Sequence, residues 1–237
     1  MTTVVVLQPG YIPWLGFFDQ MRRADHFVYY DDVQFDKHGW RNRNRVKGPA
    51  GPTWMTVPVR HTGRADQLVL HTEIVEGTNW EKKQIRTLEQ FYARAPHREP
   101  YAAEFAATIG RHWKMLADLD IAVIDVMRRW LGIATPTYRS SELCIDGDKS
   151  GRLVNLCRHF GANRYLSGEA ARSYLDVAQF DRAGIDVAWQ SYAHPTYPQL
   201  HGEFVSHLSA LDLILNVGED SRRILVSTDV GPNEAAG

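Results

Sequence analysis

The densest group of chemically capable residues lies between positions 37 and 47. Five full cations occur there within eleven positions of a chain whose formal net charge is −1. Arginine binds phosphate or carboxylate bidentately, and asparagine adds neutral donors, so the pattern predicts an anion site. A run of charge is also typical of a solvated basic loop. The group comprises Lys37, His38, Trp40, Arg41, Asn42, Arg43, Asn44, Arg45 and Lys47.

Geometry refines this prediction. On an extended segment Asn42 and Asn44 would face one side, and the three arginines the other. Trp40 is suited to stacking on a base or a sugar. We expect no nucleic-acid partner, because the basic stretch is single and the rest of the chain does not extend it. The candidate substrate-binding residues here are Lys37, Trp40, Asn42, Arg43 and Arg45.

A second group follows the first β-branched run. Gln8, Tyr11 and Trp14 lie in a Pro/Gly-rich loop after VVVL. A loop after the first strand of an α/β protein lies at the carboxyl edge of the sheet, where ligands bind. One interpretation is an aromatic-walled pocket with an amide that orients a ligand. The alternative is a rigid loop whose aromatic residues pack into the core.

Polar residues follow the second apolar run. Asp31 and Asp32 are adjacent, so on an extended segment they point to opposite faces and do not form a paired dyad. We favour Asp32 as the functional carboxylate, because it shares a face with Gln34. A solvated strand end would give the same pattern.

Two later segments add candidates. His194 precedes a proline after a predicted strand and suits a general base or a hydrogen-bonding anchor, with Tyr197 and Gln199 as pocket groups. The alternative is a histidine that caps a turn. Ser167, between a short strand and a helix, suits an anion contact or a plain N-cap.

Composition narrows the class of protein. The two cysteines fit no disulfide framework or zinc pattern, and we expect no metal site. Cys157 lies on an apolar helix face and is expected to be inert. The chain shows no signal peptide and no membrane span, so we expect a cytoplasmic protein.

The periodicity predicts elements that would position these residues. Strands are expected near 3–7, 27–30, 54–59, 67–74, 139–145, 165–166 and 187–192. Helices are expected near 15–23, 80–94, 102–119, 121–130, 152–160 (with Ser150 as N-cap), 169–175 and 204–215, the last with a cap at Ser209. Strand, helix and strand within the first thirty residues is the minimum for a parallel crossover.

These elements predict an α/β fold with a largely parallel, Rossmann-like sheet built from both ends of the chain. A helix-rich insertion would occupy about residues 80–130. We expect one domain over residues 1–226 and a flexible tail over 227–237.

Several long stretches resemble the WbqC-like family of bacterial proteins: QPGYIPWLGFF, DDVQF, WRNRNR, CRHFGANRYLSG, and HPTYPQ followed by SALDLILNVG. The resemblance runs from about Val4 to Gly218. It implies a gene neighbourhood of surface-polysaccharide or specialised-metabolite biosynthesis, and a glycyl or aminoacyl transferase role has been proposed for some members. The matching positions are Gln8, Tyr11, Trp14, Asp32, Gln34, Asn42, Arg43, Ser167, His194, Tyr197 and Gln199.

The opening also resembles the start of nucleotidyltransferase-like α/β folds, which hold phosphates with an H-x-G-H element. The corresponding residues are Trp14-Leu15-Gly16-Phe17, without a histidine, so the resemblance implies the architecture alone.

The leading hypothesis is a transferase that moves an acyl or aminoacyl group from an activated carrier to an amine or hydroxyl acceptor. His194, Asp32 and Gln8 are the catalytic candidates. Arg43 and Arg45 would hold the phosphate of a phosphopantetheine arm or a nucleotide. The alternatives are a nucleotide-dependent transferase or ligase, and a non-catalytic module that binds a carrier protein or a phosphorylated sugar.

Overall fold

A parallel sheet organises the computed structural model, which describes residues 1–37, 39–64 and 66–227. Within those residues the sheet has five strands in the order β5-β2-β1-β6-β7, and every neighbouring pair is parallel. The strands are β1 (Thr3–Leu7), β2 (His26–Tyr29), β5 (Thr137–Arg139), β6 (Arg164–Gly168) and β7 (Asp186–Gln190). The predicted α/β class with a parallel, Rossmann-like sheet is confirmed.

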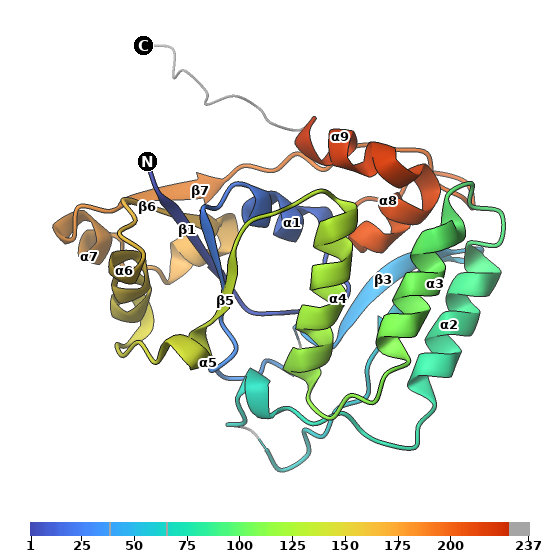
Figure 1. The fold of residues 1–237 in the computed structure, drawn as a ribbon, viewed down its shortest axis with the longest axis horizontal. Coiled ribbons are helices and arrows are strands. Elements are labelled where there is room, and N and C mark those ends of the chain that lie inside the picture. Colours follow the sequence, from blue (N-terminus) through green and yellow to red (C-terminus); the bar gives the residue numbers. More distant parts are fainter. Residues whose placement is uncertain (38, 65, 228–237) are drawn as a thin grey trace.

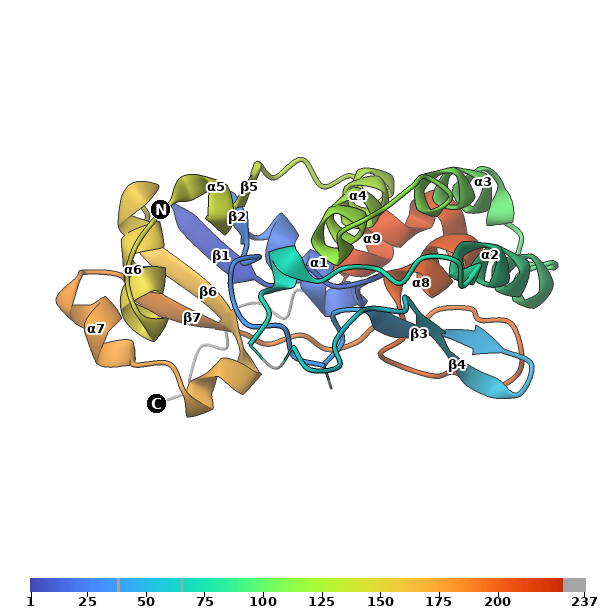
Figure 2. The ribbon, with the colours of Figure 1, turned by 90° about the horizontal axis from the view of Figure 1, so that it is seen from below.

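Helices cover both faces of this sheet, as Figures 1 and 2 show. Val5 belongs to the apolar cluster on one face, whereas Val4 and Val6 belong to the cluster on the other, as alternation along a strand requires. The first face carries α1 (Leu15–Arg22), α4 (Leu116–Trp130), α8 (Ala210–Val217) and α9 (Ser221–Val226). The second carries α6 (Lys149–His159) and α7 (Val177–Arg182).

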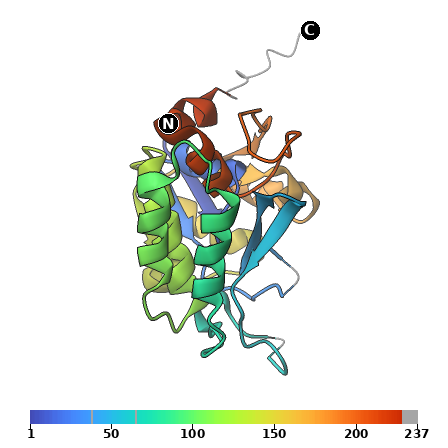
Figure 3. The same cartoon turned by 90° about the vertical axis from the view of Figure 1, so that its right-hand side faces the viewer.

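The segment between β2 and β5 supplies the rest of the fold. It contains a hairpin of β3 (Arg43–Gly48) and β4 (Gly51–Thr56), then α2 (Trp80–Phe91), α3 (Arg98–Ile109) and α4. Figure 3 shows the hairpin beside α2 and outside the parallel sheet. The helix-rich stretch falls where it is predicted. A single domain over residues 1–226 stays a prediction, and residues 228–237 of the predicted tail lie outside the described residues.

Two predicted elements are wrong because tertiary contacts override local pattern. The expected helix at 102–119 ends at Ile109, since the backbone around Met115 pairs with Glu73 and Leu116 donates to Thr72. The expected strand at 67–74 contains a 3₁₀ turn, η1 (Val69–His71), whose first two amides donate to carbonyls of the segment after β2.

Three boundaries also differ from prediction. The strand expected at 139–145 ends at Arg139, where the short helix α5 (Ser140–Leu143) begins. The last long helix begins at Ala210, with the predicted Ser209 cap accepting from Leu211. Ser150 does not cap α6 but accepts from the amide of Asp176. The remaining short turns are η2 (Glu169–Ser173) and η3 (Gly218–Asp220).

Candidate functional site

The strand order of the sheet reverses beside β1. The chain passes from β1 to β2 and β5 on one side, and later returns to β6 and β7 on the other. Ligands of open α/β sheets bind at such a switch point, outside the carboxyl ends of the strands. A cavity of about 350 Å³, which we call the switch-point cavity, lies at this edge. Its walls are Leu7, Gln8, Gly10, Pro13, Trp14, Phe17, Gln20, Trp40, Arg41, Asn44 and His207.

Hydrogen bonds hold the loop between β1 and α1 in place. The amide of Tyr11 donates to the carbonyl of Arg41, and Asn44 Nδ2 donates to the carbonyl of Ile12 at 3.0 Å. The carbonyl of Pro13 accepts from the amide of Ala210 at the start of α8. The loop is therefore tied to the hairpin and to α8, and Trp14 projects from a fixed backbone.

The segment between β7 and α8 meets this loop. The indole of Trp14 stacks on His207 with ring centroids 5.4 Å apart, and the ring of Tyr192 meets it edge-on at 5.6 Å. His194 lies behind His207, with 4.9 Å between the ring centroids. Two segments nearly two hundred residues apart in the sequence thus form one aromatic wall. His207 lines the cavity, and His194 is one ring further from it.

The electrostatic state of His194 follows from its surroundings. Burial, reinforced by His207, lowers the pKa of His194 to about 4, although the carbonyl of Pro195 opposes the shift. Nδ1 lies 3.0 Å from that carbonyl, which only accepts, so Nδ1 carries the proton. Nε2 then holds a lone pair and has no hydrogen-bond partner among the described residues. His194 is a neutral imidazole at pH 7.

Tyr197 and Gln199 contact a buried carboxylate of α8. Tyr197 Oη donates to Asp212 at 3.0 Å, Gln199 Nε2 donates to it at 2.9 Å, and Tyr92 Oη donates to its other oxygen. Lys47, itself buried, donates to the carbonyls of Gly202 and Glu203. These contacts anchor the segment that carries His194 and His207, and neither Tyr197 nor Gln199 lines the cavity.

The cationic strand β3 presents its arginines to an aromatic surface. Arg45 lies opposite Trp54 in the hairpin register, and Trp40 and Trp54 are each 46% exposed with ring centroids 5.0 Å apart. The guanidinium of Arg43 lies 4.8 Å from the Trp54 ring, and that of Arg45 lies 5.5 Å from the Trp40 ring. We call these four residues the cation–aromatic patch. Trp40 also lines the cavity, so the two features are continuous.

The other predicted residues of this segment have different partners. Asn42 Nδ2 donates to the carbonyl of Val57 and so fixes the hairpin edge. Arg41 points inward, and its Nη1 donates to the carbonyl of Gln8 at 3.1 Å. Arg41 faces Asp120, a wholly buried residue of α4, whose oxygens have no hydrogen-bond partner among the described residues. Burial raises the pKa of Asp120, and the Arg41 charge opposes that rise.

Tyr11 faces the core beneath the first loop. Its hydroxyl donates to Gln84 Oε1 at 2.6 Å, and Gln84 Nε2 donates to the carbonyl of Thr56. Tyr11 is fully buried and is not among the cavity walls. The packing interpretation of this residue therefore describes its environment better than the pocket interpretation.

Asp32 and Ser167 lie away from the cavity walls. Asp32 accepts from Ser140 Oγ at 2.6 Å and is paired with Arg152 of α6. Burial raises the pKa of Asp32, but the hydrogen bonds from Arg152 and Ser140 outweigh it, and the pKa is lowered. Ser167 alternates with Leu166, so it lies on the face covered by α6 and not on that of α1.

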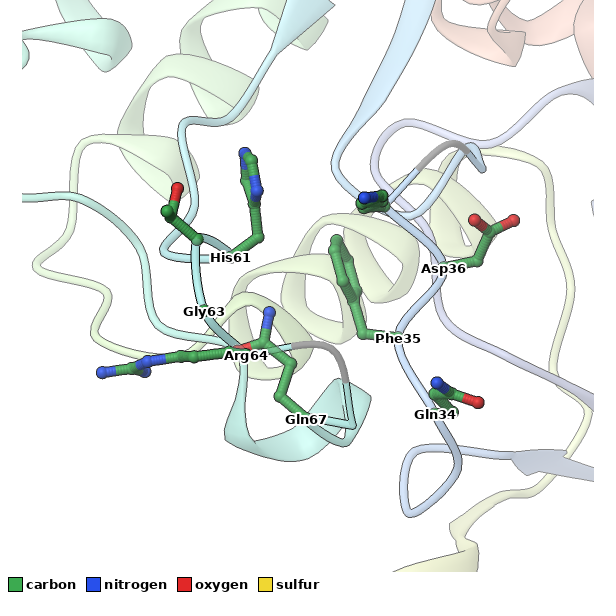
Figure 4. Close-up of a pocket in the computed structure, with 9 residues that line it drawn as sticks. Gln34, Phe35, Asp36, His61, Gly63, Arg64 and Gln67 are labelled. Atoms are coloured by element: carbon green, nitrogen blue, oxygen red, sulfur yellow. The ribbon is translucent and has the colours of Figure 1, made fainter.

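Gln34 and Lys37 line a separate hollow of about 830 Å³, shown in Figure 4. Two segments, 34–37 and 61–67, face each other across it, and the amide of Phe35 donates to the carbonyl of Gln67. Asp36 and Arg64 extend to opposite sides in the figure. Because Lys37, His61 and Arg64 are exposed, we interpret this hollow as a surface depression. His38 lies outside the described residues.

Sequence reasoning missed several walls of the cavity. Gln20 and His207 carry no motif, and Arg41 and Asn44 are recognised only as members of a basic run. One signal existed for Gln20: it is a polar residue on the helix that follows the first strand, and the N-terminal end of that helix adjoins the carboxyl edge of the sheet. No signal in the sequence indicates that His207 would reach Trp14.

Residues 1–37, 39–64 and 66–227 contain neither a metal-binding cluster nor a membrane-spanning helix. No cluster of three or more His, Cys, Asp or Glu side chains with metal-binding geometry occurs among them. None of their helices is both long and apolar enough to cross a lipid bilayer.

The fold and the site define a doubly wound α/β protein with a cavity at its switch point. Residues 8–224 match the model of the WbqC-like protein family, and the chain belongs to that family. It is 39% identical over 223 residues to the uncharacterized protein Rv1507c of Mycobacterium tuberculosis (strain ATCC 25618 / H37Rv). The aligned region covers 93% of this chain and 96% of that protein. No solved structure matches the chain.

Proposed function

We propose that this protein is a transferase that moves an acyl or aminoacyl group from a phosphate-bearing carrier to an amine or hydroxyl acceptor, in surface-polysaccharide or specialised-metabolite biosynthesis. The observation that carries the proposal is the continuity of the switch-point cavity with the cation–aromatic patch through Trp40. A carrier arm with its reactive carbonyl in the cavity and its phosphate on Arg43 and Arg45 would use both.

Such a transfer forms one bond at the carbonyl carbon and breaks another. The acceptor nitrogen or oxygen bonds to the thioester carbonyl carbon, the C–S bond breaks, and the proton lost by the acceptor ends on the thiolate. Gln8 lines the cavity and is the proposed donor to the oxyanion. Asn42, predicted from the sequence to bind substrate, already donates its side-chain amide to the carbonyl of Val57.

For proton transfer the structure offers two imidazoles. His194 is the proposed base, because its unprotonated Nε2 holds a lone pair at neutral pH, and it would act by way of His207, which lies between it and the cavity. His207 lines the cavity and is the proposed contact to the substrate. Loss of turnover in His207→Ala with retained turnover in His194→Ala would reassign the base to His207.

A nucleotide-dependent transferase or ligase is the second candidate, and the strand order favours it. The strand order reverses beside β1, so the β1–α1 loop lies where doubly wound folds bind nucleotides. This candidate predicts ATP binding and pyrophosphate release.

The experiment is calorimetric titration of acetyl coenzyme A, a thioester on a phosphate-bearing arm. We expect Arg43→Ala/Arg45→Ala to weaken binding about tenfold or more and to flatten its salt dependence. Arg164→Ala is the matched control, because that arginine lies at the opposite, amino end of β6 and pairs with Asp186. Equal affinity of the double variant and the wild type would refute the carrier proposal.

A further inference from the structure

Gln20 of α1 lines the switch-point cavity, and its side chain holds a buried acceptor that lacks a donor among the described residues. The residue is only 5% exposed, and its Oε1 has no hydrogen-bond partner among residues 1–37, 39–64 and 66–227. A buried carbonyl oxygen without a donor is unfavourable, so a native structure keeps one where something else supplies the donor. The oxygen therefore marks a point of contact for a ligand or a bound solvent molecule.

The orientation of the Gln20 amide is set by its neighbours. Gln190, at the carboxyl end of β7, has its Nε2 2.8 Å from the carbonyl of Gly16 and 2.7 Å from a carboxylate oxygen of Asp19. Both partners only accept, so the Gln190 nitrogen must face them and its oxygen must face Gln20. Gln20 accordingly donates Nε2 to that oxygen, at 2.8 Å.

Asp19 makes this relay rigid. It is fully buried, and its other carboxylate oxygen is held by Arg22 at 2.7 Å and by Arg23 at 3.0 Å. A flip of either glutamine would set two oxygens against each other, or a nitrogen against a nitrogen. The relay from Asp19 through Gln190 to Gln20 thus fixes the oxygen as the end of the Gln20 amide that has no partner among the described residues.

The side chain of Gln20 lies beside the switch point. A Cβ built on Gly168, at the end of β6, would be 3.6 Å from Gln20 Nε2. The Gln20 side chain therefore extends toward β6, the strand next to β1. Gln8, at the end of β1, supplies a second buried amide oxygen without a partner among the described residues. Gln8 and Gln20, each with an amide oxygen unpartnered among those residues, therefore both line the switch-point cavity.

We infer that Gln20 is a specificity-determining residue whose Oε1 accepts a hydrogen bond from a neutral N–H or O–H of the bound substrate, such as an amide or a hydroxyl. The carbonyl oxygen of Gln20 repels an anionic group, so the phosphate-bearing end of the substrate lies toward the cation–aromatic patch. That orientation rests on the proposed function, whereas the acceptor role of Gln20 does not.

The test compares two probes that differ only in their donors. Acetamide carries N–H groups, and N,N-dimethylacetamide carries none. Each is titrated into ¹⁵N-labelled protein while the side-chain amide of Gln20 and the indole N–H of Trp14 are followed by NMR. We expect a saturable shift with acetamide and at least fivefold weaker binding of the dimethyl compound. Gln20→Met should abolish the difference, and Gln90→Met, on the exposed side of α2, should preserve it.

Equal titration of the wild type by the two probes, or no saturable shift with either, would overturn the inference without any variant. Discrimination that persists in Gln20→Met would also overturn it. None of these results depends on acetyl coenzyme A, so failure of the carrier proposal and failure of this inference are separate outcomes.

Discussion

Substitution of Gly16 by alanine should displace Trp14 from the cavity wall. Gly16 is the second residue of α1, and a Cβ built on it would lie 2.2 Å from Cη2 and 2.3 Å from Cζ2 of the Trp14 indole. Carbon atoms pack best near 3.5 Å, so the indole must retreat by roughly 1.3 Å. The neighbours that hold it, His207 and Tyr192, must then move as well.

Two opposing effects determine how much Gly16→Ala changes the stability of the fold. Alanine in place of glycine stabilises a helix by up to about 1 kcal/mol, and overpacking costs about 1–3 kcal/mol. With Trp14 present, Gly16→Ala should therefore lower the free energy of unfolding by roughly 0–2 kcal/mol. When Trp14 is already alanine, the clash is absent and the same change should stabilise by about 0.5–1 kcal/mol. The coupling between the two sites is thus roughly 1–3 kcal/mol.

The assay is a double-mutant cycle of Gly16→Ala and Trp14→Ala by urea unfolding, joined to titration with acetyl coenzyme A. Loss of one aromatic wall corresponds to about tenfold weaker binding. Additive effects on stability, or Gly16→Ala protein that binds as tightly as the wild type, would refute the reasoning.

Three further outcomes are expected. Asp212→Asn turns an amide nitrogen toward side chains that donate to Asp212, so it should destabilise the fold by about 2–4 kcal/mol and lower Tm by roughly 10 °C. Proteolysis between residues 191 and 208 should become faster. An unchanged Tm would show that Asp212 does not anchor this segment. Tyr11→Phe leaves Gln84 Oε1 without its donor and should cost about 1–2 kcal/mol in urea unfolding, whereas an unmoved midpoint would show the bond to be dispensable. Because the folded-state pKa of His194 is about 4 against an ordinary 6.5, the unfolded chain binds the extra proton between these values. Stability of the wild type relative to His194→Asn should fall as the pH drops from 6.5 to 4, and a pH-independent difference would exclude the shift.

Much of the sheet could be predicted from local pattern. The run from Thr3 to Leu7, the apolar spacing of the following helix and the second strand give β1, α1 and β2 almost residue for residue. The failures arose where a distant segment supplied the hydrogen bonds. Phe105, Ile109 and Trp113 have helical spacing, yet the helix ends at Ile109 because the chain near Met115 pairs with Glu73.

The candidate site was predicted only in part, because local pattern reveals some of its residues and distant contacts position the others. Gln8 and Trp14 follow a buried strand, and that position alone indicates the sheet edge. Tyr197 and Gln199 have pocket-type side chains, but a buried aspartate on α8 holds them, and no local pattern reveals that partner. Likewise the amide oxygen of Gln20, unpartnered among the described residues, depends on Gln190, 170 residues away along the chain.

The most direct test of the switch-point cavity as the ligand site is a crystal structure of the protein soaked with acetyl coenzyme A. The account predicts electron density for the thioester arm between Gln8, Trp14 and Trp40, with the phosphates near Arg43 and Arg45. Density confined to the hollow of Gln34 and Arg64, with the cavity beside Trp14 holding only solvent, would contradict it.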